Sequence, residues 1–193
     1  MKRAIGDRLS AFGSGWKIGC AAALLLAAAC WQPGDERQVK NAVGSFYDVY
    51  MKVRPSGVPP REQQAEFKKF ISTGLAGLLD AAASMEENSS REAQGPPPPR
   101  IEGDLFTSSD EGAVSYKIVQ CEMQKPAATC VVELTNADDR NRAKLAWKDR
   151  VFLVQDGGRW VVDDIEFLGD QQFMHRGRLK DVLKQVIEEG KTV

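Results

Sequence analysis

Residues 151–167 read VFLVQDGGRWVVDDIEF and contain the clearest signal for β-structure in the chain. Two runs rich in β-branched and aromatic residues flank the tripeptide Asp-Gly-Gly at 156–158. An Asp-Gly pair between two such runs is a strong short-range signal for a β-hairpin, because the tight turn needs the positive φ that glycine adopts at no steric cost. The sequence therefore predicts two antiparallel strands that meet at this turn.

Alternation with a period of two extends the predicted sheet toward the N-terminus. Successive side chains of a strand point to opposite faces, so apolar residues at every second position indicate a half-buried strand. Two further segments have this pattern, with apolar side chains at Val114, Tyr116 and Ile118 and at Cys130, Val132 and Leu134. Together with the hairpin they predict three or four antiparallel strands.

Helical spacing dominates before these strands. From Glu36 to about Arg54 the apolar residues recur at intervals of three and four, which indicates an amphipathic helix. A second helical region begins after Pro60. Ser72 or Thr73 is expected to cap a third, short helix, because a hydroxyl side chain accepts a free N–H of the first turn.

A connector and a last helix complete the predicted domain. Four consecutive prolines make residues 94–100 a stiff, extended connector. Residues 176–189 have helical spacing, and Gly190 is expected to end that helix. The predicted fold class is α+β, with two to three N-terminal helices packed on a three- to four-stranded antiparallel sheet, plus a C-terminal helix. It forms a single domain over residues 36–193.

The first 29 residues are predicted to be a secretory signal peptide. Basic residues precede an apolar run of twelve residues at 18–29, which ends in small side chains. This order is typical of such signals. The run is too short for a transmembrane helix, which needs about 20 residues to cross a bilayer. Residues 30–35 are expected to be a short tether in front of the domain.

Cys30 is the candidate lipidation site. Residues 26–30, Leu-Ala-Ala-Ala-Cys, resemble the lipobox of bacterial lipoproteins, in which the peptidase cuts before a cysteine that is then diacylated. Leu26 lies four residues before the cysteine instead of three, so an ordinary cleavage without acylation stays open as the alternative. Acyl chains would hold the protein firmly to a leaflet. Trp31 in the next position favours the outer membrane, facing the periplasm.

Charge and motif content exclude several classes of partner. The chain has 26 basic and 27 acidic residues, and without residues 1–29 the balance is 22 against 26. No basic stripe is present, so a nucleic-acid partner is not expected. The sequence has neither a glycine-rich phosphate loop nor the acidic spacing of a calcium loop, so no cofactor and no metal are expected.

Cys121 and Cys130 are predicted to form a structural disulfide. One ends a predicted strand and the other begins the next, so the bond would close the mouth of a hairpin and contribute ~2–3 kcal/mol in the chain-entropy model. A redox or metal role is the alternative. The sequence has no Cys-x-x-Cys pair and His175 is its sole histidine, which favours the structural role in an oxidising compartment.

Three segments resemble a bacterial family. They read FYDVYMK at 46–52, EGDLFTSS at 102–109 and the hairpin sequence at 151–167. On these segments the chain is similar, over about residues 36–170, to the family called domain of unknown function 3828, whose members are often envelope lipoproteins. The last segment also resembles strands of the cone-shaped, cystatin-like α+β fold of nuclear-transport-factor-2-like proteins. The resemblance implies that fold and location, and it supplies no catalytic residue.

Two acidic residues of the hairpin are candidates for a site. Because neighbouring strand residues point to opposite faces, one of Asp163 and Asp164 is expected to face inward. An inward carboxylate of raised pKa would be able to act as the base of a small isomerase or dehydratase. The alternative is a structural carboxylate that pairs with Arg150 or Lys148 on the neighbouring strand.

Two tryptophans and the histidine complete the set of candidates. Trp147 and Trp160 lie on the strands joined by the turn, and they would line an apolar pocket together with the two acids or fill the core. His175 lies in a polar connector and is expected to be an exposed residue near the start of the last helix rather than a catalytic base.

The expected function is that of a non-catalytic binding or accessory module of the cell envelope. It would be anchored to the membrane through Cys30 and would hold an envelope protein or a small ligand. One alternative is an acid/base enzyme that uses Asp163 or Asp164, which a buried, unpaired carboxylate inside a cavity would favour. The other is a subunit or immunity-type lipoprotein of an envelope or secretion machine, which a large exposed apolar patch would favour.

Overall fold

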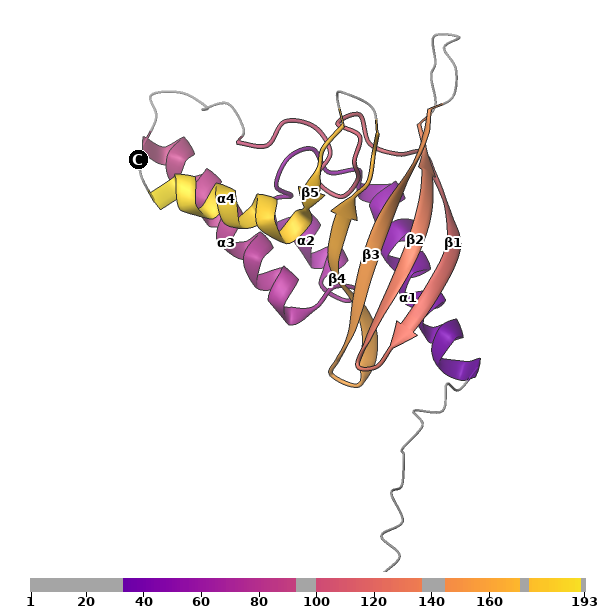
Figure 1. Ribbon diagram of the computed structural model, residues 1–193. Helices are drawn as coiled ribbons and strands as arrows, with labels where there is room; N and C mark the ends of the chain where they lie inside the picture. Colours follow the sequence, from indigo (N-terminus) through magenta and orange to yellow (C-terminus); the bar gives the residue numbers. More distant parts are fainter. Residues whose placement is uncertain (1–32, 93–99, 137–144, 171–173, 192–193) are drawn as a thin grey trace, which may run out of the picture. The chain divides into compact units, whose positions relative to one another are not determined.

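Helices come first in the chain and strands follow (Figure 1). The computed structural model describes residues 33–92, 100–136, 145–170 and 174–191. Three helices precede the sheet: α1 (Pro33–Val53), α2 (Arg61–Phe67) and α3 (Thr73–Glu92). The strands are β1 (Ser115–Gln124), β2 (Ala127–Thr135), β3 (Ala146–Asp156), β4 (Arg159–Phe167) and the short β5 (Gly177–Arg178), which leads directly into α4 (Leu179–Lys191). The predicted α+β class is confirmed, with β5 as an additional strand.

The strands form one antiparallel sheet in the order of the sequence, from β1 at one edge to β5 at the other. The turn predicted at 156–158 joins β3 to β4, and Gly157 and Gly158 have positive φ values of 58° and 79°. The register shifts at Val119 in β1 and at Asp163 in β4. Each shift is a bulge that inserts one residue, so the strict alternation of side chains between the two faces is interrupted there.

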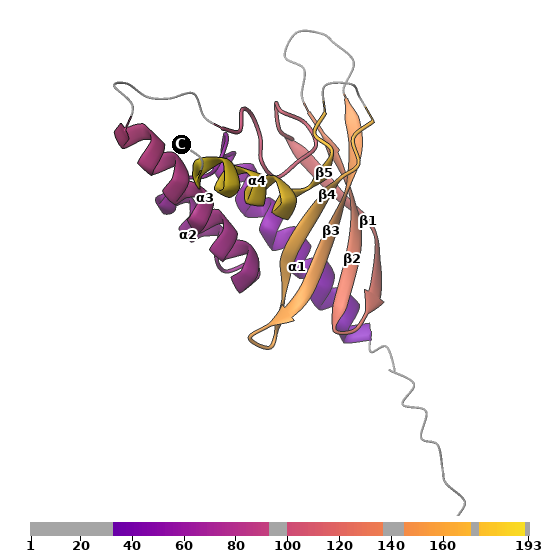
Figure 2. The same ribbon diagram turned by 60° about the vertical axis from the view of Figure 1, so that its left-hand side comes forward.

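One face of the sheet carries the hydrophobic core. In β2 every second residue is buried, from Ala128 to Leu134. α1 lies along this face, as the two ribbon views show (Figures 1 and 2). Three aromatic rings from different elements pack together in this core, with centroids 4.8–5.8 Å apart. They belong to Phe46 of α1, Phe67 of α2 and Phe106 of the loop before β1. Burial of this apolar surface is the main stabilising term of the fold.

α3 is longer than the sequence predicts. Ser72 caps its start as expected, because its hydroxyl oxygen accepts the N–H of Leu75 at 3.0 Å. The helix then continues to Glu92, through a segment without an apolar stripe, alongside α4. The prediction that Gly190 ends α4 is wrong: this residue lies inside the helix, and a Cβ at its position would meet Met85 of α3 at 2.8 Å. Glycine here allows the two helices to approach closely.

The segment before α3 extends the edge of β4. The N–H of Ser72 bonds to the carbonyl of Val162 at 2.8 Å, and the N–H of Val162 bonds to the carbonyl of Phe70 at 2.8 Å. Ile71 thus forms a parallel bridge with Val162. The outer side of β4 is therefore shared between residues 70–72 and β5, and the bulge at Asp163 lies where the two meet.

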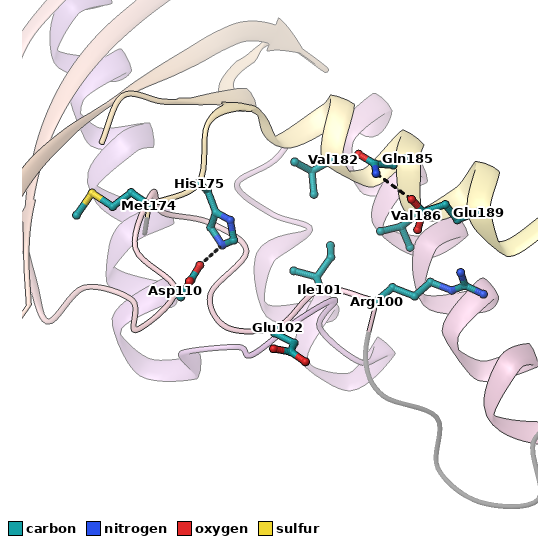
Figure 3. Close-up of a pocket in the computed structure, with 10 residues that line it drawn as sticks. All are labelled: Arg100, Ile101, Glu102, Asp110, Met174, His175, Val182, Gln185, Val186 and Glu189. Atoms are coloured by element: carbon teal, nitrogen blue, oxygen red, sulfur yellow. Dashed lines mark hydrogen bonds and ion pairs between the residues drawn. The ribbon is translucent and has the colours of Figure 1, made fainter. Parts of the chain in front are cut away.

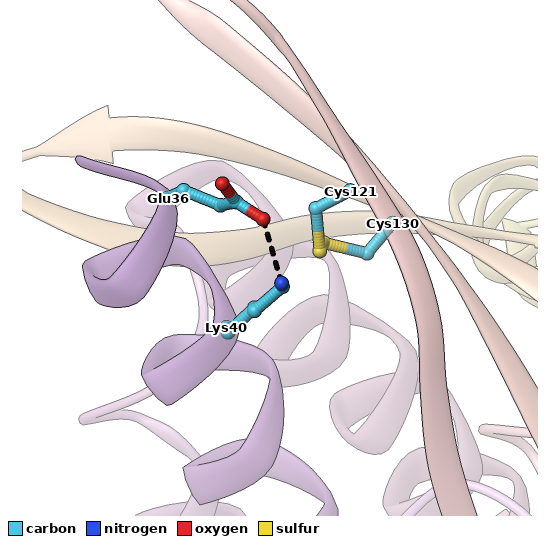
Figure 4. The surroundings of a disulfide bond; sticks show 4 residues. All are labelled: Glu36, Lys40, Cys121 and Cys130. Atoms are coloured by element: carbon cyan, nitrogen blue, oxygen red, sulfur yellow. Dashed lines mark ion pairs between the residues drawn. A yellow bond between two sulfur atoms is a disulfide. The ribbon is translucent and has the colours of Figure 1, made fainter. Parts of the chain in front are cut away.

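The disulfide predicted between Cys121 and Cys130 is present (Figure 4). It joins opposite residues of β1 and β2 on the face toward α1. α1 begins at Pro33, three residues before the predicted start at Glu36, so the helix takes in part of the expected tether. Asp35 in this first turn forms an ion pair with Lys125 of the β1–β2 turn, which fixes the start of α1 against the hairpin.

Residues Trp31–Val193 form one compact unit, and the buried apolar side chains described within it make up a hydrophobic core. Among the helices that the structure describes, none has the length and apolar character needed to cross a bilayer. The predicted signal peptide over 1–29, the candidate lipidation site Cys30 and the prolines at 96–99 lie outside the described residues.

Candidate functional site

Asp163 lies at the bulge of β4 and is engaged by two partners. Its Oδ1 accepts the hydroxyl of Ser72 at 2.6 Å and lies 2.6 Å from Nζ of Lys180 in α4. The bulge turns this side chain toward the starts of α3 and α4. Asp163 therefore joins three elements at one point, and its carboxylate is neutralised by a lysine.

Asp164 is buried and holds the start of α4. Its Oδ1 accepts the N–H groups of Ile165 at 2.9 Å and of Lys180 at 3.1 Å, and its Oδ2 lies 3.5 Å from the guanidinium of Arg178. Burial raises the pKa of Asp164, while the two N–H donors and the neighbouring cations lower it. The carboxylate is placed where the free N–H groups and the dipole of a helix N-terminus stabilise negative charge.

The basic partners expected for these acids were wrong. Arg150 of β3 pairs with Glu166, directly across the sheet, at 2.5 Å. The partners come instead from β5 and α4, which follow β4 in the chain and return to its edge. Cross-strand reasoning missed them because neither the bulge at Asp163 nor the short β5 has a visible sequence pattern.

Trp147 and Trp160 both lie in the hydrophobic core, 4% and 5% exposed. The indole N–H of Trp147 donates to Oδ2 of Asp149 at 3.2 Å. In the described part of the chain, the indole N–H of Trp160 has no hydrogen-bond partner. Of the three pockets described in this section and the next, none is lined by either tryptophan or by Asp163 or Asp164.

A buried carboxylate that sequence reasoning missed, Asp149, fixes the loop before β1. Ser108 of this loop donates to it through both its N–H, at 2.9 Å, and its hydroxyl, and the N–H of Leu168 donates at 3.1 Å. Burial raises the pKa of Asp149, and these donors lower it. Its position was foreseeable, because strand alternation places Asp149 on the same inward face as Trp147 and Val151.

A second buried carboxylate, Asp104, fixes the same loop to α1. The hydroxyl of Tyr50 donates to its Oδ2 at 2.7 Å, and the N–H of Phe106 donates to its Oδ1 at 2.8 Å. Burial raises the pKa of Asp104 to about 6, although these hydrogen bonds lower it. The segment 102–109, singled out by the family resemblance, is thus held at both ends by buried acids.

The loop held in this way forms one wall of a cleft of about 470 Å³, which we call the His175 cleft (Figure 3). Its opposite wall is α4. Its apolar lining consists of Ile101, Met174, Val182 and Val186. Its polar lining consists of Arg100, Glu102, Asp110, His175, Gln185 and Glu189. The lining is thus about half polar, and a ligand that combines an apolar part with charged or hydrogen-bonding groups would fit it.

His175 is held in the cleft from two sides. Its Nε2 lies 2.7 Å from Oδ1 of Asp110, and its backbone N–H donates to the carbonyl of Ser108 at 2.7 Å. The imidazole also packs near the ring of Phe167, with centroids 5.9 Å apart. Its side chain is 29% exposed, so His175 is a cleft residue rather than the freely exposed residue expected from its polar connector.

The ionisable side chains of the cleft are the His175–Asp110 pair together with Arg100, Glu102 and Glu189. Among the described residues that line it, none is a serine, threonine or cysteine that would serve as a nucleophile next to the imidazole. The described residues also contain no group of three or more side chains able to hold a metal ion.

A further cleft, of about 520 Å³, lies between α3 and the β3–β4 turn. Asp156 of the turn accepts the N–H of Thr73 at 2.7 Å, and this bond lowers the pKa of the carboxylate. Lys68 and Asp80, which also line this cleft, form an ion pair at 3.3 Å. These charges are already satisfied within the chain, so this cleft is the weaker candidate for a ligand site.

Comparisons with known proteins leave the function open. No family model and no curated protein matches the chain, so the resemblance to domain of unknown function 3828 stays a prediction. One solved structure, from Bacteroides thetaiotaomicron and described as a protein of unknown function, is similar with 19% identity and a TM-score of 0.33. The match covers 68% of this chain and 93% of that one.

Proposed function

We propose that the protein is a lipid-anchored binding module of the cell envelope, in which Cys30 carries the anchor and the His175 cleft takes the ligand. The partner would be an envelope protein or a small ligand. The observation that carries the proposal is the position of the cleft relative to α1. The helix begins at Pro33, three residues after Cys30, and the cleft lies near its other end.

The length of α1 sets the distance between its first residue, Pro33, and the pocket at its C-terminal end. Tyr50, Arg54 and Asp110 border a small pocket at the C-terminal end of α1, and Asp110 also lines the His175 cleft. An α-helix rises about 1.5 Å per residue, so Tyr50 lies roughly 25 Å along the axis from Pro33. The length of α1 therefore separates Pro33, which follows Cys30 by three residues in sequence, from the pocket that shares Asp110 with the His175 cleft.

The two hairpin carboxylates support a binding role over a catalytic one. Asp163 is paired with Lys180 and Asp164 with Arg178. A general base needs a carboxylate that faces the substrate and is free to take its proton. Both carboxylates instead hold the junction of β4 with α3 and α4.

The anchor is tested by intact mass. The wild-type chain and Cys30→Ala are expressed in a Gram-negative host, and the membrane fraction is analysed by mass spectrometry. We expect a mature chain that begins at Cys30 and carries a triacyl mass increment, which the substitution removes. An unmodified chain of the same start would contradict the anchor and make the protein a freely diffusing periplasmic one.

The cleft is tested by site-specific photo-crosslinking in the same host. A benzophenone amino acid replaces Val182, which lines the cleft, or Lys184, which is on the same helix and pairs with Asp181 outside the cleft. We expect a discrete crosslinked product from position 182 only. Equal products from both positions, or none from either, would contradict a partner protein in the cleft and leave a small ligand as the occupant to be sought by native mass spectrometry.

A further inference from the structure

β1 is the outermost strand of the sheet, and no described strand pairs with its outer side (Figure 1). None of its ten residues is fully buried, whereas in β2 every second residue is. Val119 in this strand is 44% exposed, and Val114 just before it is 37% exposed. A long edge strand with free N–H and C=O groups is a ready template for pairing with another strand.

The hydrogen-bonding groups of this edge have a defined orientation. The Cα atoms of Cys121 and Cys130 are 4.1 Å apart. A separation this short is typical of an antiparallel pair that exchanges no backbone hydrogen bonds. The N–H and C=O of Cys121 therefore point away from β2 toward the open edge, and those of Met123, two residues on, point the same way.

We propose that β1 pairs with β1 of a second copy of this chain, antiparallel, about a two-fold axis between Val119 and Gln120. In this register Lys117 lies directly opposite Glu122 of the second copy, and the symmetry produces this contact twice. The two sheets would join into one continuous antiparallel sheet. This inference concerns the sheet edge and is independent of the anchor and of the His175 cleft.

Opposite charges select this register. Lys117 and Glu122 both lie on the sheet face away from the core, as outward residues of the strand. Charges of opposite sign that face each other across antiparallel strands attract, and like charges repel. A shift by one residue would set Lys117 against Cys121 or Met123 of the second copy, whose side chains face the core. Such a shift would mismatch the two faces along the whole strand.

The core-facing side chains match in the same register. Tyr116, Ile118, Cys121 and Met123 are partly buried against the core. With the axis between Val119 and Gln120, Tyr116 meets Met123 and Ile118 meets Cys121, so each apolar side chain covers another. The bulge at Val119 makes this match, because it moves the alternation by one residue between Ile118 and Cys121.

The test is a charge-reversal series on the compact unit Trp31–Val193 with its disulfide oxidised, measured by sedimentation velocity over a range of concentrations. We expect a wild-type dimer, and a dissociation constant raised about tenfold or more by Glu122→Lys, because two attractive pairs become two repulsive ones. Lys117→Glu should act likewise. The double reversal Lys117→Glu/Glu122→Lys should restore the dimer. Lys148→Glu, on the same face but on β3, should leave the dissociation constant unchanged.

Three outcomes would overturn the proposal: a wild-type monomer at every concentration, a dimer that Glu122→Lys does not weaken, or a double reversal that stays monomeric. Lys117 lies across from Glu133 of its own chain, whereas Glu122 lies across from Thr129. Glu122→Lys therefore creates no like-charge pair with its cross-strand neighbour, and a thermal unfolding curve equal to that of the wild type separates loss of pairing from loss of folding.

Discussion

Tyr50 donates its phenolic hydroxyl to Oδ2 of Asp104 at 2.7 Å, and the hydroxyl oxygen of Tyr50 in turn accepts the N–H of Ala113 at 2.8 Å. The contact joins the last turns of α1 to both ends of the loop that precedes β1. Asp104 is 5% exposed, so its carboxylate depends on the Tyr50 hydroxyl and the N–H of Phe106 rather than on water. One tyrosine thus positions the wall of the His175 cleft relative to the helix that leads to Cys30.

The burial of Asp104 predicts a dependence of stability on pH. Its pKa in the folded protein is raised to about 6 from 3.8, so the folded state binds this proton more tightly than the unfolded chain does. Its stabilising contribution is fully present below the unfolded pKa and is lost as the pH rises through about 6, on the order of 3 kcal/mol in all. We expect Asp104→Asn to remove this component from urea unfolding free energies measured between pH 4 and 8.

The effect of Asp104 is the difference between the curves of unfolding free energy against pH for the wild type and for Asp104→Asn. This difference is needed because Asp149 also has a raised pKa and contributes a pH dependence of the same sign to both curves. The wild-type free energy of unfolding should fall more steeply than that of Asp104→Asn between pH 4 and 6. Parallel curves over that interval would show that Asp104 is already ionised in the folded protein at low pH.

Tyr50→Phe should destabilise the protein, whereas Tyr47→Phe, one turn earlier on the same helix, should not. The substitution removes the donor to Oδ2 of Asp104 and the acceptor of the Ala113 N–H, at a cost of about 1–3 kcal/mol. It should also raise the pKa of Asp104 further, because the Tyr50 hydrogen bond lowers it. Tyr47 is buried on the same helix, and within the described structure its hydroxyl has no hydrogen-bond partner.

Tyr47→Phe is therefore the matched control, expected to be neutral or slightly stabilising in the same urea titration at pH 7. A loss of stability of equal size in the two variants would mean that removal of a buried hydroxyl as such, and not the hydrogen bond to Asp104, accounts for the effect of Tyr50→Phe.

Much of the fold follows from local patterns, and the departures have physical causes. The hairpin turn at 156–158, the cap at Ser72 and the disulfide partners each depend on residues close in sequence, and the structure confirms them. The last turns of α3 carry polar residues and lie alongside α4. No local pattern marks such a tertiary contact, so the helix was predicted too short.

The candidate site was less visible for the same reason. Asp163 and Asp164 were found as a pair, but their partners depend on β5, a two-residue strand without a pattern of its own. Asp104 and Asp110 lie in a loop whose conformation depends on buried carboxylates and long-range hydrogen bonds. Asp149 is the exception. Strand alternation alone places this acid on the inward face of its strand, so its burial could have been predicted from the sequence.

Asp149→Asn should cost more stability than Asp163→Asn. Four donor contacts converge on the two oxygens of Asp149, from Ser108, Leu168 and Trp147. An amide offers one acceptor oxygen and places its own N–H groups against donors, which leaves buried groups unpaired and should cost about 2–4 kcal/mol. Asp163 is half-buried and loses mainly its ion pair with Lys180, worth at most about 1 kcal/mol.

Urea unfolding at pH 7 measures both substitutions, and hydrogen exchange of the Ser108 amide reports whether the loop has come free of β3. A cost for Asp163→Asn as large as that for Asp149→Asn would place the main anchor of the fold at the β4 bulge instead. Faster exchange at Ser108 in Asp163→Asn would point the same way.

The disulfide should stabilise the folded protein through the unfolded chain. Cys121 and Cys130 are nine residues apart in sequence. Closing a loop of this size lowers the entropy of the unfolded state, which raises its free energy by about 2–3 kcal/mol at 25 °C. We expect the double variant Cys121→Ala/Cys130→Ala to lose about this much in urea unfolding under oxidising conditions. Adding a reductant should lower the wild-type stability toward that of the variant and leave the variant unchanged.

Both alanines are apolar, so the buried position of Cys130 acquires no unpaired polar group. A variant as stable as the oxidised wild type would contradict this expectation. It would mean that the β1–β2 hairpin stays paired in the unfolded chain without the disulfide, or that contacts such as the Asp35–Lys125 ion pair offset its loss in the folded protein.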